Sequence, residues 1–161
     1  MVRTNNLPQR RTMISLAAAT LCGLLWTHLY LTLWFGWQST AQTYAVSGFY
    51  AVGLAVGLAL TFLADHWLLC RIRNLTIRRV VWIALAFLLV ALITAALLAA
   101  QYRLYFSQWH EPFLSRDWVL QQVFTAIGAI AQYAIFGIHY HGPGALLIIL
   151  VTCWWATRTK H

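Results

Sequence analysis

Long apolar runs recur along the whole chain, and this pattern constrains the fold more than any other feature of the sequence. A helix rises about 1.5 Å per residue, so about 20 apolar residues cross the roughly 30 Å of hydrocarbon in a bilayer. Runs of this length lie at 13–37, 44–70, 80–101 and 118–138, and a shorter one lies at 144–156. Only 9% of the residues are charged, against about 25% in soluble domains. The sequence therefore predicts one polytopic transmembrane domain over residues 1–161.

The apolar runs are expected to be helices. They are apolar on all faces, lack the period-2 alternation of membrane strands, and are rich in Leu and Ala. The predicted fold class is an all-α integral membrane protein, a bundle of four transmembrane helices plus a short C-terminal apolar segment. For the segment 144–156, a fifth span and a re-entrant helix both stay open. The first run exceeds the usual apolar length of a signal peptide, so it is interpreted as a retained span.

The basic residues predict the orientation. They precede the first run and fill the second connection, at Arg3, Arg10, Arg11, Arg71, Arg73, Arg78 and Arg79. Loops rich in Lys and Arg stay cytoplasmic, so the N-terminus and residues 71–79 are expected inside, in a multi-pass protein of the cell inner (plasma) membrane. The net charge of +8 is attributed to topology and to attraction to anionic membrane lipids, and no nucleic-acid partner is predicted.

The stretch HYHGPG at 139–144 is expected to break the last apolar region. Pro143 lacks an N–H group and disfavours helix at the residue before it, and the flanking Gly142 and Gly144 tolerate unusual conformations. A broken backbone in a bilayer is tolerated only where it is wet or lined by protein. The first interpretation is therefore a turn at the membrane surface, with His139 and His141 as interfacial residues.

A second interpretation of these histidines is a metal site. If the fourth run descends from outside, His139 and His141 reach the cytoplasmic depth of Asp65 and His66, and such ligands suit Zn, Cu, Ni or Fe. Asp65 is the only acidic residue within an apolar run, and a charge there needs a partner. An ion pair of Asp65 with the nearby arginines of the second connection, Arg71 or Arg73, is the simpler account.

Two polar residues lie well inside apolar runs, His28 in the first and Gln132 in the fourth. No second histidine is central enough to share a haem with His28, so His28 is expected to hydrogen-bond across the bundle to Thr61, Thr94, Gln132 or Tyr133. Gln132 is expected to face the protein interior, since an unpaired amide in hydrocarbon is costly. No cofactor is predicted, and metal or haem stay as alternatives.

Small residues mark candidate helix-packing faces, at Gly53, Gly57, Gly128 and Gly137. Small side chains let helix backbones approach closely where lipid supplies no hydrophobic driving force for association. Packing inside one chain and packing between two copies both fit this pattern.

The third connection, QYRLYFSQWHEPFLSRDW, is the largest candidate for an exposed functional surface. Trp, Tyr and Arg dominate protein-binding hot spots, so this stretch is predicted to dock a partner. The residues proposed for docking are Tyr102, Arg103, Tyr105, Trp109, His110, Glu111 and Arg116. The alternative is an aromatic belt that holds an interfacial helix, with Ser115 capping the fourth run.

No catalytic motif stands out in the sequence. There is no phosphate-binding loop, no dinucleotide fingerprint, no H-E-x-x-H and no C-x-x-C. The stretch FLADHWLLCRIRNLTIRRVVWIALAFLL resembles the span, basic turn and span of the sensor region of LytS-type histidine kinases, in pattern and without a shared motif. The preferred hypothesis is a non-enzymatic inner-membrane protein, an accessory subunit of a membrane complex or an immunity or exclusion protein. Its partner would be another membrane protein or a second copy. The alternatives are a histidine-based metal or haem protein and a small sensor-like or transporter module.

Overall fold

The computed structural model describes residues 7–105 and 111–158, and helices joined by short connections make up most of these ranges. Its elements are α1 (Leu7–Leu33), α2 (Ala41–Trp67), the short η1 (Leu69–Arg71), α3 (Leu75–Tyr105), α4 (Arg116–Gln132), the π-helical η3 (Tyr133–Gly137) and α5 (Ile138–Arg158). The expectation of an all-helical fold is confirmed for these ranges, in which no strand is present.

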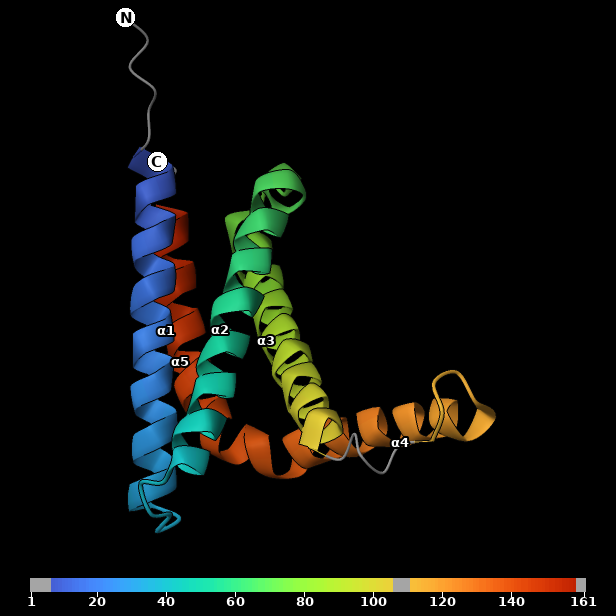
Figure 1. Ribbon diagram of the computed structural model, residues 1–161. Coiled ribbons are helices and arrows are strands. Elements are labelled where there is room, and N and C mark those ends of the chain that lie inside the picture. The colour runs from blue at the N-terminus through green and yellow to red at the C-terminus, as the bar shows by residue number, and fades with distance from the viewer. Residues whose placement is uncertain (1–6, 106–110, 159–161) are drawn as a thin grey trace, which may run out of the picture.

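Four helices run side by side and form a bundle, and the fifth leaves it (Figure 1). The bundle consists of α1, α2, α3 and α5, whereas α4 runs crosswise at one end and projects sideways. Among the described elements, α4 contacts α3 and η3 and has no contact with α1, α2 or α5. The start of α1, the end of α5 and the α2–α3 turn share the opposite end of the bundle.

Length and composition alone give four helices within the described ranges that could cross a membrane. These segments are Thr12–Leu33, Ala41–Trp67, Leu75–Leu104 and Arg116–Ile135, while α5 contains a shorter apolar helix, His141–Thr157. The arrangement in space departs from the predicted bundle, because the fourth run lies crosswise and the C-terminal segment packs beside α1 in its place. The predicted short segment at 144–156 is the larger part of a helix of 21 residues.

The predicted break at HYHGPG is wrong. Residues 139–144 form the first turns of α5, and the chain changes direction just before them, through η3. Pro143 lies inside this helix as its sixth residue, and the π-helical η3 directly precedes the helix. A Cβ on Gly144 would lie within 2.5 Å of the Trp26 indole, so this glycine lets α5 approach α1 closely.

Two glycines bring α2 into close contact with α3. A Cβ on Gly53 would overlap the side chain of Thr94, and one on Gly57 would lie 2.7 Å from the backbone nitrogen of Val90. The core continues from this contact through apolar side chains that are fully buried, among them Leu54, Leu58, Trp82, Ala86 and Ile149. The two predicted packing glycines of α2 therefore lie at a contact inside one chain.

Buried hydroxyl side chains of α2 and α3 form hydrogen bonds within their own helices. Those of Thr61 and Thr94 donate to the carbonyls four residues earlier, at 2.8 Å and 2.7 Å. Such back-bonding removes the cost of an unpaired hydroxyl in apolar surroundings. These groups are therefore compatible with burial between helices and need no ligand to explain them.

Candidate functional site

Asp65 forms a buried ion pair near the end of the bundle that holds the α2–α3 turn. Nε and Nη2 of Arg78 both donate to Oδ1 of Asp65, with an Nε–Oδ1 distance of 2.9 Å. The side chain of Asp65 is 8% exposed and that of Arg78 is 11% exposed. The predicted partners Arg71 and Arg73 are wrong, because both precede α3, whereas Arg78 lies on its first turns and faces α2.

The neighbouring arginine ties α3 to α5 at the same end. Nε of Arg79 donates to the hydroxyl of Thr157 at 3.1 Å, and that hydroxyl donates in turn to the carbonyl of Cys153 at 2.9 Å. Together with the Asp65–Arg78 pair, this contact connects three helices. We call this set the basic-end cluster. Its polar groups hold helices together.

The proposed metal ligands do not meet. Asp65 and the exposed His66 lie in the last turn of α2, whereas the exposed His139 and the buried His141 begin α5 at the other end of the bundle. The expected common depth is wrong, because it required the fourth run to bring residues 139–141 back to the cytoplasmic end. Within the described ranges, no group of three or more His, Cys, Asp and Glu side chains is placed to hold a metal ion.

His141 is held between helices at the end of the bundle near the arm. Its Nδ1 lies 3.5 Å from the hydroxyl of Thr27, and its ring lies 4.9 Å from that of Tyr50. Tyr50 also stacks on Tyr133 at 6.1 Å, and a Cβ on Gly137 would press against both tyrosines. The predicted packing glycine Gly137 thus makes room for this aromatic group. Nε2 of His141 is buried without a hydrogen-bond partner among the described residues.

The two polar residues inside the predicted spans, His28 and Gln132, depart from expectation. His28 stacks on Tyr44 with ring centroids 4.6 Å apart, and none of its described contacts is one of the four predicted hydrogen bonds. Gln132 is exposed, so the prediction that it faces an interior is wrong. At this end of α4 the buried positions are its neighbours Ala129 and Tyr133.

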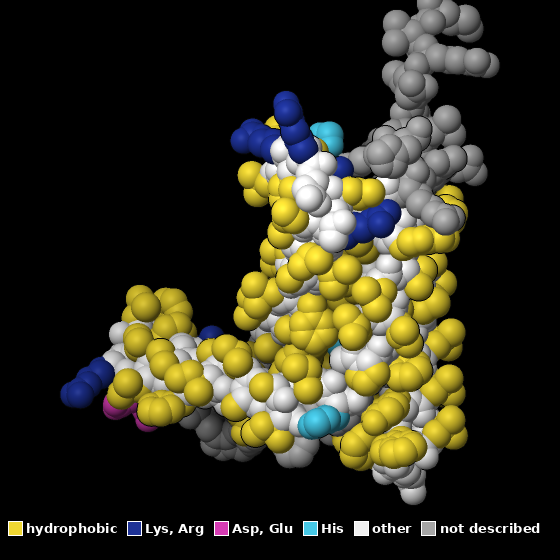
Figure 2. All heavy atoms as spheres, turned by 180° about the vertical axis from the view of Figure 1, so that it is seen from behind, with side chains coloured by type: hydrophobic (Ala, Val, Ile, Leu, Met, Phe, Trp, Pro, Cys, Tyr) yellow, Lys and Arg dark blue, Asp and Glu magenta, His cyan; other side chains and the backbone are white. Residues whose placement is uncertain are grey.

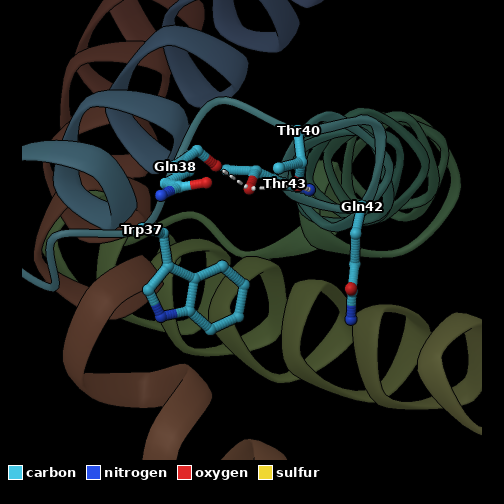
Figure 3. Close-up of a pocket in the computed structure, with 5 residues that line it drawn as sticks. All are labelled: Trp37, Gln38, Thr40, Gln42 and Thr43. Carbon is cyan, nitrogen blue, oxygen red and sulfur yellow. Dashed lines mark hydrogen bonds between the residues drawn. The ribbon is translucent and has the colours of Figure 1, made fainter.

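The α1–α2 connection holds a small open pocket (Figure 3), and this connection lies at the same end of the bundle as α4 (Figure 1). The pocket has a volume of about 230 Å³ and is lined by Trp37, Gln38, Thr40, Gln42 and Thr43. Thr43 donates to the carbonyl of Gln38 at 2.6 Å, and the Thr40 hydroxyl accepts from the backbone nitrogen of Thr43 as the cap of α2. The hydroxyls of the pocket are therefore occupied in shaping the loop.

We call α4, Arg116–Gln132, the arm. Its large apolar side chains Val123, Phe124 and Ile127 are exposed, and Phe124 and Ile127 show 69% and 57% of their surface. The opposite face, with Gln121, Thr125 and Ala129 at helical spacing, is half-buried or buried, and α4 packs there against the end of α3. The rest of the described protein therefore leaves the most hydrophobic face of the arm uncovered. Gly128, a predicted packing position, is exposed and has open space around it.

The free end of the arm is a tight, aromatic turn. We call residues 111–118 the arm tip. The backbone nitrogen of Ser115 donates to the carbonyl of Pro112 at 3.0 Å, and the Ser115 hydroxyl caps α4 by accepting from the Trp118 nitrogen at 3.1 Å. Leu114 has φ = 64°, and it is the single non-glycine residue at positive φ in the described part of the chain. Phe113 and Leu114 are 75% and 69% exposed.

An edge-on pair of rings and an arginine brace this turn against α3. Phe113 meets Trp118 edge-on with centroids 4.8 Å apart, and the Arg103 guanidinium lies 5.5 Å above the Trp118 ring. The backbone nitrogen of Glu111 also donates to the side chain of Gln121 at 3.3 Å. An arginine over an indole gains a cation–π attraction, so the tip is fixed although most of it is exposed.

The structure brings several predicted docking residues together. Arg103 braces the tip, Glu111 and Arg116 lie exposed on it, and Tyr102 is half-exposed near the end of α3. Tyr105 ends α3, while Trp109 and His110 fall outside the described residues. Sequence reasoning did not single out Phe113, Leu114 or Trp118.

Comparison with known proteins gave no assignment. No family model, no curated protein and no solved structure matches this chain.

Proposed function

We propose that the protein is a non-enzymatic, multi-pass inner-membrane protein that binds another membrane protein through the arm tip. In this role it serves as an accessory subunit of a membrane complex or as an immunity or exclusion protein. The observation that carries the proposal is the strained, exposed Leu114 beside Phe113, on a turn braced by Arg103 and Trp118. Residues held in left-handed conformations cost about 1–3 kcal/mol and cluster at functional sites.

The proposed orientation follows from the distribution of charge. Figure 2 shows arginine side chains gathered at the end of the bundle that lies away from the arm. Basic loops are retained in the cytoplasm, which assigns the α2–α3 turn and the N-terminus to that side. The arm and its tip then lie on the non-cytoplasmic side, where an extracytoplasmic part of a partner reaches them.

The chemistry of the tip is typical of protein recognition. Aromatic and arginine side chains on a rigid support lose little conformational entropy on binding, and they dominate measured hot spots. Phe113 and Leu114 supply apolar anchors, and Arg116, Asp117 and Glu111 supply charges of both signs around them. A partner surface with an apolar pocket and a mixed polar rim fits this pattern.

Site-specific photocrosslinking in cells tests the proposal. A benzophenone amino acid replaces Phe113, and a matched control replaces Leu25, which is similarly exposed but lies on α1 in the bundle. We expect a discrete adduct with one membrane protein from position 113 and none from position 25. The adduct should disappear when Arg116→Glu is added. Adducts of equal yield from both positions, adducts with only a second copy of this chain, or no adduct would each contradict the proposal.

A further inference from the structure

We infer that the arm lies in the plane of the membrane, seated in the interface of the non-cytoplasmic leaflet, with phospholipid as the partner of its exposed apolar face. The inference rests on the proposed membrane location and orientation of the bundle. It adds the lipid contact and assigns the four crossings to α1, α2, α3 and α5.

The direction of the arm is the first argument. The bundle helices define the direction of crossing, and α4 runs crosswise to them at the end of the bundle in both Figure 1 and Figure 2. Its 17 residues therefore extend about 25 Å along the membrane surface. A crossing by α4 would require it to swing into line with α3, away from the contacts it makes with the end of that helix.

The distribution of side chains around the arm is the second argument. Val119, Val123, Ile127 and Ile130 recur at helical spacing on one face, and all four are exposed. Gln121 and Thr125 lie on the other face, with Asp117 in the first turn. In Figure 2, hydrophobic side chains cover the side of the arm that faces the basic end of the bundle. The acidic side chains lie at the lower edge of the arm. A helix with this division lies in an interface with its apolar face among acyl chains.

The surroundings of the arm are the third argument. Trp34, Trp37 and Phe35 are exposed in the α1–α2 connection, at the same end of the bundle as the arm. Trp118 lies in the first turn of the arm with Arg103 over its ring. Indole rings concentrate at the level of lipid headgroups, and arginines extend their charge toward water while their stems stay apolar. The aromatic rings of the α1–α2 connection and of the first turn of the arm therefore lie at one end of the bundle, which we assign to the level of the lipid headgroups. The arm lies at that level.

Spin labels along the arm test the inference directly. The cysteines Cys22, Cys70 and Cys153 are replaced in a background that is then labelled at single positions and reconstituted into phosphatidylethanolamine–phosphatidylglycerol vesicles. Labels at Val119, Val123, Ile127 and Ile130 report depth through their relative accessibility to oxygen and to a nickel chelate. We expect one shallow depth at all four positions and a clearly greater depth at the control Leu88, which is exposed near the middle of α3.

Two results would overturn the inference. If α4 crossed the membrane, depth would change by about 1.5 Å per residue, or about 16 Å between positions 119 and 130. If protein rather than lipid covered the face, accessibility to both oxygen and nickel would be low at all four positions. A label that prevents folding, detected by gel filtration, is moved to Leu120 or Phe124 on the same face. The vesicles contain only this protein, so the outcome does not depend on the partner proposed for the arm tip.

Discussion

The basic-end cluster and the arm tip use charged and strained residues in opposite ways. At the basic end, Asp65 is paired with Arg78, and Arg79 bonds to Thr157, so polar groups join three helices. At the arm tip, Leu114 holds an unfavourable backbone conformation and presents its side chain outward. The difference indicates that the basic end serves stability. The arm tip exposes a residue in an unfavourable conformation, which agrees with the recognition surface that we propose.

Breaking the ion pair should have the largest effect on stability. Arg78→Ala leaves the buried Asp65 carboxylate without its partner, and removing one member of a buried pair costs about 3–5 kcal/mol. We expect the lower end of this range, about 3 kcal/mol, because both side chains keep slight exposure. Unfolding in mixed micelles with increasing sodium dodecyl sulfate measures the loss. Arg71→Ala, at an exposed position in the adjacent turn, is the control, and an equal loss in both variants would refute the role of the pair.

A pair of glycine substitutions sharpens the contrast between the bundle and the arm. Gly57→Ala places a Cβ against the backbone of Val90, so it should lower the free energy of unfolding by about 1–3 kcal/mol. Gly128→Ala meets open space on the arm and should raise it by about 0.5–1 kcal/mol, because alanine restricts the unfolded chain. The same titration compares the two variants. A loss of similar size at both positions would show that the arm is packed as tightly as the bundle.

Relieving strain at the tip should have the smallest effect on stability. Leu114→Gly removes a left-handed cost of about 1–2 kcal/mol and adds a glycine entropy cost of about 0.5–1 kcal/mol. We therefore expect stability within about 1 kcal/mol of the parent protein, together with a strong loss of the adduct formed from position 113. Leu104→Gly removes a leucine from an exposed position in the last turn of α3, and it should leave the adduct intact. An undiminished adduct in Leu114→Gly would remove Leu114 from the docking surface.

The apolar runs predicted the helices well, because membrane-length hydrophobicity is encoded locally in the chain. The orientation of each helix relative to the others is not encoded locally in the chain. The run at 118–138 looks like a span by composition, yet α4 lies crosswise, since its direction depends on its contact with the end of α3. Pro143 likewise suggested a break, yet α5 continues through it.

The candidate site was predicted only in part, for reasons visible in individual residues. Arg103 and Arg116 followed from composition, since arginine among aromatic residues is a hot-spot pattern. Leu114 could not be found in this way, because positive φ is usually signalled by glycine or asparagine and leucine carries no such signal. The pairing of Asp65 with Arg78 required knowledge of how α2 and α3 face each other across the turn.

The sidedness of residues 116 and 139 tests the central claim most directly. In the background without native cysteines, Arg116→Cys and His139→Cys each place a thiol at an exposed position, at opposite ends of the segment formed by α4 and η3. With α4 in the membrane plane, a membrane-impermeant maleimide should label both from outside intact spheroplasts. Arg73→Cys, in the basic turn, should react only after permeabilisation. Labelling of position 116 from outside and of position 139 only after permeabilisation would show that the fourth run crosses the bilayer and would contradict the account.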